Sequence, residues 1–283
     1  MSLDAATVLL QWAVGGLLFL WVTTRRREVG IGYGWLLRGV YLVMAAGSVV
    51  AGRLLDPVPV RDLAAVGVAA GTAVALAVSV MRRRAGVAGE RARRERRSAR
   101  VTAMTGIDRR VGVVDRDVPE FPPGLDLVAP LIGVVGLVAA GLDAGGSPAL
   151  AVLRTVVGAA FLGAVSDAML LGHWYLVQPG LARAPLLELV RWVTVLWPLE
   201  VAALVLPTGM LQVLSGSVDD GYSGLLGWFW VACAVTTLVL CLLTRAALRE
   251  RYYSAVMAAT GLLYLAILTA FGTDLVARAV LAT

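Results

Sequence analysis

Eight long apolar stretches constrain this chain more than any other feature of its sequence. A transmembrane helix needs roughly twenty predominantly apolar residues, and the stretches have about that length. They are rich in Ala, Gly, Val and Leu without alternating polarity, which predicts helices and argues against a barrel. They cover about residues 5–23, 34–55, 63–81, 126–142, 149–172, 186–207, 224–244 and 252–273. We therefore expect an all-α integral membrane protein, a polytopic bundle of about eight transmembrane helices.

The overall composition agrees with a bilayer environment. Of the 283 residues, 59% are hydrophobic and only 16% are charged, whereas a soluble domain carries about a quarter charged residues. The first stretch has no basic region in front of it and is followed by Arg25, Arg26 and Arg27. We interpret it as a retained membrane helix and not as a signal peptide.

The arginines predict the orientation. Those that follow the first, third, fifth and seventh stretches are Arg25–Arg27, a group between residues 82 and 100, Arg183, and then Arg245, Arg249 and Arg251. The intervening loops carry aspartates and only Arg53 and Arg61. Under the positive-inside rule the arginine-rich loops are cytoplasmic and both termini are extracytoplasmic. We expect a plasma or inner membrane of the bacterial type.

The predicted cytoplasmic loop of about residues 82–125 is rich in arginine. Its first half is compatible with a helix that continues the third stretch, and its second half contains several prolines and is expected to be irregular. Nucleic acid is not an expected partner, because the loop lacks interleaved aromatic residues. Contacts to anionic lipid headgroups or to an acidic partner subunit are expected from Arg82, Arg83, Arg84, Arg93, Arg94, Arg96 and Arg97.

Several kinds of chemistry are excluded by residue counts. The chain has one histidine, His173, so a haem with two histidine ligands and histidine-rich zinc or di-iron sites are not possible. It contains no HExxH, GxSxG or Walker A pattern. Cys233 and Cys241 are interpreted as reduced packing residues. We expect no metal site, no covalently bound cofactor and no catalytic centre of its own.

Four charged residues inside the stretches are candidates for pairs or for a path. Counting 1.5 Å per residue places Arg154 level with Glu200, and Asp167 level with Arg191. Each couple is either a structural ion pair or part of a proton, ion or ligand path, because charge near the bilayer centre is costly. Pro198, two residues before Glu200, predicts a kink of the kind that borders binding cavities.

Two further charged sites are expected to be structural. Arg38 lies about one turn inside the second stretch and is expected to extend to the headgroups. Asp274 and Arg278 stand four residues apart at the end of the last stretch, which is typical of a surface pair.

The segment around His173 has two interpretations. Trp and Tyr are enriched at membrane interfaces, so Trp174 and Tyr175 can simply be interfacial residues. The alternative is a quinone site, in which His173 binds a carbonyl and carries a proton, an aromatic residue holds the ring, and a carboxylate relays the proton. That set comprises His173, Trp174, Tyr175, Gln178, Asp167, Arg191 and Glu188.

These observations leave three functional hypotheses. The first is an anchor or quinone-contacting subunit of a larger, respiratory membrane complex, without its own haem or metal. The second is a secondary transporter or channel with a site at Glu200 and Arg154. The third, a lipid-modifying enzyme, needs clustered carboxylates at one interface, where Asp219 and Asp220 are the only adjacent pair.

Overall fold

The computed structural model describes residues 4–105, 119–178 and 180–281, apart from the side chains of Arg94 and Thr105, and the regular secondary structure of this part of the chain is all helical. Helices correspond to the apolar stretches as follows: α1 Ala5–Thr24, α2 Ile31–Leu54, α3 Pro59–Met81, α5 Val128–Asp143, α6 Pro148–Val177, α7 Ala184–Val205, α9 Leu225–Ala247 and α10 Tyr253–Leu281. The shorter elements are η1 Arg83–Ala85, α4 Ala88–Thr105, η2 Pro123–Leu127 and α8 Gly209–Leu214.

Among the described residues, seven helices are long and apolar enough to cross a membrane, with η2 and α5 forming one of them. This indicates a multi-pass membrane protein. Helix α7 is not among the seven, although its 22 residues extend about 33 Å. It carries three charged residues, Glu188, Arg191 and Glu200. The count of eight spans therefore stays a prediction.

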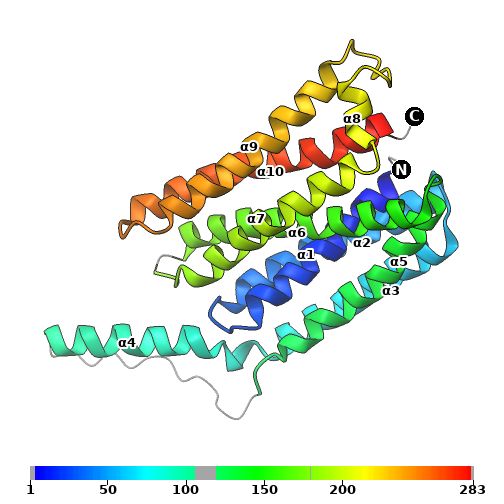
Figure 1. Cartoon of the computed structure of the whole chain (residues 1–283). Helices are drawn as coiled ribbons and strands as arrows, with labels where there is room; N and C mark the ends of the chain where they lie inside the picture. Colours follow the sequence, from blue (N-terminus) through cyan, green and yellow to red (C-terminus); the bar gives the residue numbers. More distant parts are fainter. Residues whose placement is uncertain (1–3, 106–118, 179, 282–283) are drawn as a thin grey trace.

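The two ends of the bundle differ in charge. Both chain termini lie at one end (Figure 1), which we call the terminus end. At the opposite end, the arginine-rich end, α1 runs into Arg25–Arg27 and α3 runs into Arg82–Arg84. Helix α4 projects from the bundle at this end (Figure 1).

Local sequence explains where several helices begin and end. Asp4 caps α1 by accepting a hydrogen bond from the Thr7 backbone N–H at 2.7 Å. Pro59 and Pro148 begin α3 and α6, where a missing N–H costs no helical bond. Gly86, with φ of +63°, separates η1 from α4 in a conformation that favours glycine. The arginine-rich segment therefore forms a helix of its own and does not continue α3.

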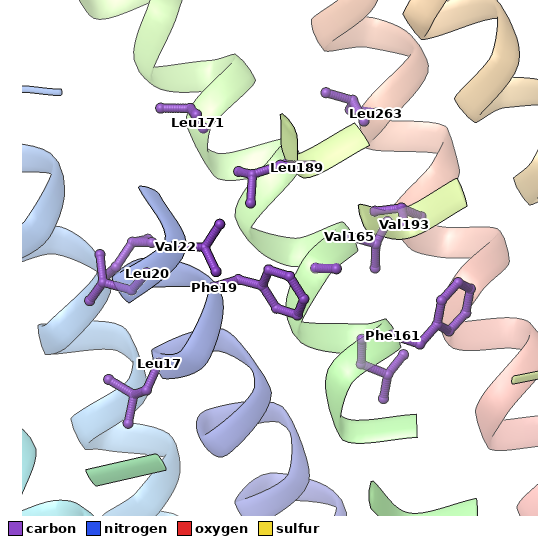
Figure 2. Packing of buried hydrophobic residues seen from close by; sticks show 14 of the residues in the cluster. Leu17, Phe19, Leu20, Val22, Phe161, Val165, Leu171, Leu189, Val193 and Leu263 are labelled. Carbon is purple, nitrogen blue, oxygen red and sulfur yellow. The ribbon is translucent and has the colours of Figure 1, made fainter. Parts of the chain in front are cut away.

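Helices α1 and α6 form the centre of the bundle. Of the 20 residues of α1, 13 are buried, and α1 packs on α2, α5 and α6, while α6 also packs on α7 and α10. Figure 2 shows Phe19 of α1 pointing toward Val165 of α6, with Leu189 and Val193 of α7 close by. The central packing is aliphatic and aromatic except at the polar sites described below.

The backbones of α1 and α6 touch at Gly15 and Gly163. A Cβ atom at Gly15 would lie 1.8 Å from the carbonyl oxygen of Ala159, and one at Gly163 would lie 2.1 Å from the carbonyl carbon of Gly15. Only glycine permits such an approach, as in other close contacts between membrane helices. The contact sets the height of α1 relative to α6.

We expect Gly163→Ala to destabilise the bundle, because the added methyl group must push α1 away from α6. Overpacking of this kind costs about 1–3 kcal/mol. The matched control is Gly261→Ala in α10, where a Cβ atom meets nothing within 4 Å and alanine favours the helix. Thermal unfolding in detergent measures both, and equal melting temperatures for the two variants would contradict the packing described here.

Candidate functional site

A group of buried polar side chains lies between α1, α7 and α10, toward the terminus end. Gln11, Glu200, Asp274 and Arg278, which we call the acid–arginine cluster, have exposed fractions of 1% or less. Asp274 and Arg278 form the predicted pair, with Asp274 Oδ2 2.7 Å from Arg278 Nε. The prediction that this pair lies on the surface is wrong, because α10 continues to Leu281 and turns both residues into the bundle.

Gly158 of α6 makes room for the cluster. A Cβ atom at this position would lie 2.6 Å from Gln11 Nε2, 2.8 Å from Asp274 Oδ1 and 3.2 Å from Arg278 Nη2. Three side chains from α1 and α10 therefore converge over one glycine. Gln11 is held in place by donating a hydrogen bond from Nε2 to the Thr155 carbonyl at 2.8 Å.

Glu200 completes the cluster from α7. It follows Pro198, which lies within a continuous helix, and its carboxylate interacts electrostatically with Asp274, Arg278 and Arg154. Two carboxylates and two guanidinium groups thus share one region of low dielectric constant. Neighbouring carboxylates repel each other, and a shared proton or a cation relieves that repulsion; Arg278 supplies one positive charge here, through its ion pair with Asp274.

Five polar atoms of the cluster have no hydrogen-bond partner in the described part of the chain. They are Gln11 Oε1, Glu200 Oε1, Glu200 Oε2, Asp274 Oδ1 and Arg278 Nη2. A buried polar group without a partner costs about 1–3 kcal/mol, so such groups normally bind water, an ion or a proton. The cluster therefore has the donors and acceptors of a small polar binding site.

Arg154 connects this region to the terminus end. Among the described residues, Arg154 does not form an ion pair with Glu200. Its Nε donates to the Ala203 carbonyl at 2.9 Å and its Nη2 to the Leu206 carbonyl at 2.6 Å, so the guanidinium instead binds the carbonyls that end α7. Arg154 also borders an open groove of about 640 Å³ formed with Pro207, Gly209 and neighbouring residues.

Asp167 forms a second buried polar site, nearer the arginine-rich end. Its Oδ1 accepts a short hydrogen bond from the Tyr41 hydroxyl, its backbone carbonyl lies 3.4 Å from the Tyr33 hydroxyl, and its Oδ2 has no partner. The predicted pair with Arg191 does not form, because Asp167 faces α2 whereas Arg191 is exposed on α7. Counting residues predicted that Asp167 and Arg191 lie at the same height along their helices, but it could not show which face of each helix they occupy.

The residues around His173 point in three directions. His173 is exposed and its Nδ1 lies 2.9 Å from the Tyr264 hydroxyl of α10. Trp174 packs against Tyr33 with ring centroids 6.0 Å apart and donates to Gln178 Oε1 at 3.1 Å. Tyr175 is buried and donates to the Ala182 carbonyl. Successive helix positions diverge by about 100°, so the structure does not bring the predicted quinone set together in one slot.

The arginines of residues 82–97 have different environments. Arg82 donates to the Glu120 carbonyl at 3.0 Å and Arg93 to the Glu28 carbonyl at 2.6 Å. Arg83 and Arg84 border a groove of about 400 Å³ that Trp174 and Gln178 also line. Arg96 and Arg97 are exposed, and the side chain of Arg94 lies outside the described part of the structure.

Sequence reasoning missed a buried ion pair at the arginine-rich end. Arg38 binds Asp126 through two hydrogen bonds of 2.8 Å, donates to Ser79 Oγ at 3.2 Å and lies 4.2 Å from the centre of the Phe121 ring. The expectation that Arg38 extends to the headgroups is therefore wrong. Asp126, at the start of the fourth apolar stretch, was the signal that α2 has a partner there.

The carboxylates of the loop before α9 are engaged by backbone groups. Asp220 accepts hydrogen bonds from the N–H groups of Gly224, Tyr222 and Leu226, of which the Gly224 bond contributes most to holding the pKa of Asp220 below its usual range. Asp219 accepts from the Gly221 N–H. This arrangement caps α9 and gives no support to a carboxylate-based enzyme site.

Comparison with known proteins gives no match: no family model, no curated protein and no solved structure is significantly similar to this chain. Among the described residues, no group of three or more His, Cys, Asp or Glu side chains is arranged to hold a metal ion.

We expect Asp126→Ala to destabilise the fold strongly, because it leaves Arg38 buried without a counter-charge. Breaking a buried pair in this way costs about 3–5 kcal/mol. Asp143→Ala, at the exposed end of α5, is the control and is expected to change stability by less than about 0.5 kcal/mol. The yield and melting temperature of purified protein report the difference. A stable Asp126→Ala variant would show that the pair contributes little.

Proposed function

We propose that this chain carries protons across the membrane and that it binds them at Glu200 and Asp274. The observation that carries the proposal is the pair of fully buried carboxylates with unpaired oxygens beside Arg278. Ionisable groups inside a membrane protein are costly and commonly mark proton or ion pathways. A proton shared by the two carboxylates leaves one negative charge to pair with Arg278.

The proposal includes a membrane orientation. The arginine-rich end faces the cytoplasm of a bacterial-type plasma or inner membrane, and both termini face the outside. Helix α7 serves as the eighth span. Its Glu200 is buried in the bundle, while Glu188 and Arg191 lie within about 11 Å of its beginning, close to the headgroup region. The charges that distinguish α7 from the other spans are therefore compatible with a bilayer.

The two buried acidic sites suggest a route for the proton. In the proposed route the proton enters from the terminus end by way of the groove at Arg154, which does not itself reach the four residues of the acid–arginine cluster. Asp167 lies nine residues beyond Gly158 along α6, a rise of about 14 Å toward the arginine-rich end, and its Oδ2 is unpaired. Glu200 with Asp274 forms the outer station of this route and Asp167 forms the inner one.

We expect Glu200→Gln to reduce proton flux at least about tenfold, because the amide cannot exchange the proton. The assay uses proteoliposomes that contain a pH-sensitive dye and are driven by a potassium diffusion potential. Glu250→Gln, which removes an exposed carboxylate, is the matched control. Gel filtration and melting temperature establish that both variants fold. Wild-type flux no greater than that of protein-free liposomes, or full flux in folded Glu200→Gln, would contradict the proposal.

The orientation has its own test in a background with Cys233 and Cys241 replaced by alanine. Ala99→Cys on α4 and Ser217→Cys in the loop before α9 both introduce cysteine at exposed positions. An impermeant thiol reagent added to intact cells is expected to label Cys only in the Ser217→Cys variant. Labelling of both variants, or only of Ala99→Cys, would overturn the orientation.

A second candidate function is quinone contact within a larger respiratory assembly. The groove bordered by Trp174, Gln178 and Gly32 favours it, because an indole and an amide can hold a ring and bind a carbonyl. His173 lies on another face of α6 and takes no part in this version. Co-migration of the chain with haem- or flavin-bearing proteins after mild detergent extraction from native membranes is the observation that would favour this function over transport.

A further inference from the structure

A second groove lies at the arginine-rich end, beside α7 and the ends of α1 and α9. Its volume is about 700 Å³, and it is bordered by Arg26, Glu188, Arg191, Trp192, Arg245 and Arg249. Trp192 and Val195 have exposed fractions of 39% and 49%. The groove therefore adjoins an apolar strip that continues along the outer face of α7.

The positive charge of this groove is not neutralised by the protein. Glu188 is the carboxylate on its border, and it already binds Arg25 at 2.6 Å and Arg26 at 2.7 Å. In the described part of the chain, Arg191, Arg245 and Arg249 have no carboxylate within ion-pair distance, although each is exposed. Arg38, Arg61 and Arg278, which are buried in the bundle, differ from these three because each has a carboxylate partner.

Arg191 is the deepest of these three arginines. It stands seven residues inside α7, about 10 Å from the beginning of the helix, and faces outward between apolar residues. A guanidinium in this position extends toward the headgroup region and needs an anion there. Arg245 in the last turn of α9 and Arg249 just beyond it bring two more guanidinium groups to the same groove.

The walls of the groove are fixed relative to one another. Arg183, just before α7, donates hydrogen bonds to the carbonyls of Leu248 at 3.2 Å and Arg251 at 3.0 Å. These bonds hold the end of α9 beside the beginning of α7. The helix ends that carry the three arginines are therefore held together before any ligand binds, which lowers the entropic cost of binding.

We propose that this groove binds an anionic membrane phospholipid whose headgroup carries two phosphates. Arginine forms paired hydrogen bonds with phosphate oxygens, and basic pockets at the cytoplasmic side of membrane helices are suited to such headgroups. The acyl chains lie along the apolar strip of Trp192 and Val195. This strip distinguishes a lipid from a soluble phosphate, which has nothing to place there.

The site differs from the general headgroup contacts expected of α4. Those contacts depend on exposed arginines along one helix, whereas the groove combines three helix ends with an apolar wall. It also gives Arg191 a role that is independent of proton transport. Failure of the lipid site would leave the proposal for Glu200 unaffected.

The test titrates the full-length protein in detergent with cardiolipin, a phospholipid with two phosphates, and follows binding by native mass spectrometry. The variant is Arg191→Gln/Arg245→Gln/Arg249→Gln. Its affinity is expected to fall at least about tenfold, because charge-assisted hydrogen bonds are lost. The control is Arg96→Gln/Arg97→Gln/Arg100→Gln, which removes the same charge from α4 and is expected to change the affinity by less than about twofold.

Three results would overturn the proposal. Equal losses in the two triple variants would show non-specific attraction, and unchanged binding in the groove variant would show that lipid does not bind there. Displacement of the lipid by an equal concentration of pyrophosphate would show a site for a soluble anion. Melting temperatures without lipid check folding, and the single variant Arg191→Lys, which keeps the charge but not the paired geometry, is expected to bind more weakly than wild type.

Discussion

The contact between the α1 and α6 backbones at Gly15 and Gly163 determines where both buried polar sites lie. It places Gln11 of α1 beside Thr155 and Gly158 of α6, so that the amide joins the acid–arginine cluster. Gly16, the residue after Gly15 in α1, leaves space for the ring of Tyr41, since a Cβ atom there would lie 2.0 Å from that ring. Tyr41 can then reach Asp167. A displacement of α1 along α6 would disturb both sites together.

The charged residues of the bundle fall into two groups with different physical roles. Arg38 with Asp126, and Arg61 with Asp4, have direct ion pairs and further hydrogen bonds. These pairs tie helices together near the two ends of the bundle. The acid–arginine cluster is different, because it is as deeply buried but leaves five polar atoms unpaired. Full pairing is the arrangement expected of structural charge, and the lack of it is what supports a functional role for Glu200 and Asp274.

The positions of the long helices were predictable, because about twenty apolar residues in a row leave few alternatives. Their mutual faces were not, since the apolar stretches have no strong polar side and contain small residues on several faces. For this reason the sequence predicted that Arg154, Glu200, Asp167 and Arg191 lie in long helices, but it did not predict the partners of Arg154 and Asp167. Gln11, the only amide in the first stretch, and the apolar residues on either side of Arg278 were signals that these positions are buried. Which helices meet there follows only from the three-dimensional packing.

The central claim is that Glu200 holds an exchangeable proton inside the bundle. Infrared difference spectroscopy between acidic and alkaline pH measures this directly, through the carbonyl stretch of a protonated carboxylic acid. We expect a band that disappears at alkaline pH, shifts in deuterated water and is absent in folded Glu200→Gln. A spectrum in which Glu200→Gln shows the same carboxylic acid bands as the wild-type protein would contradict the account.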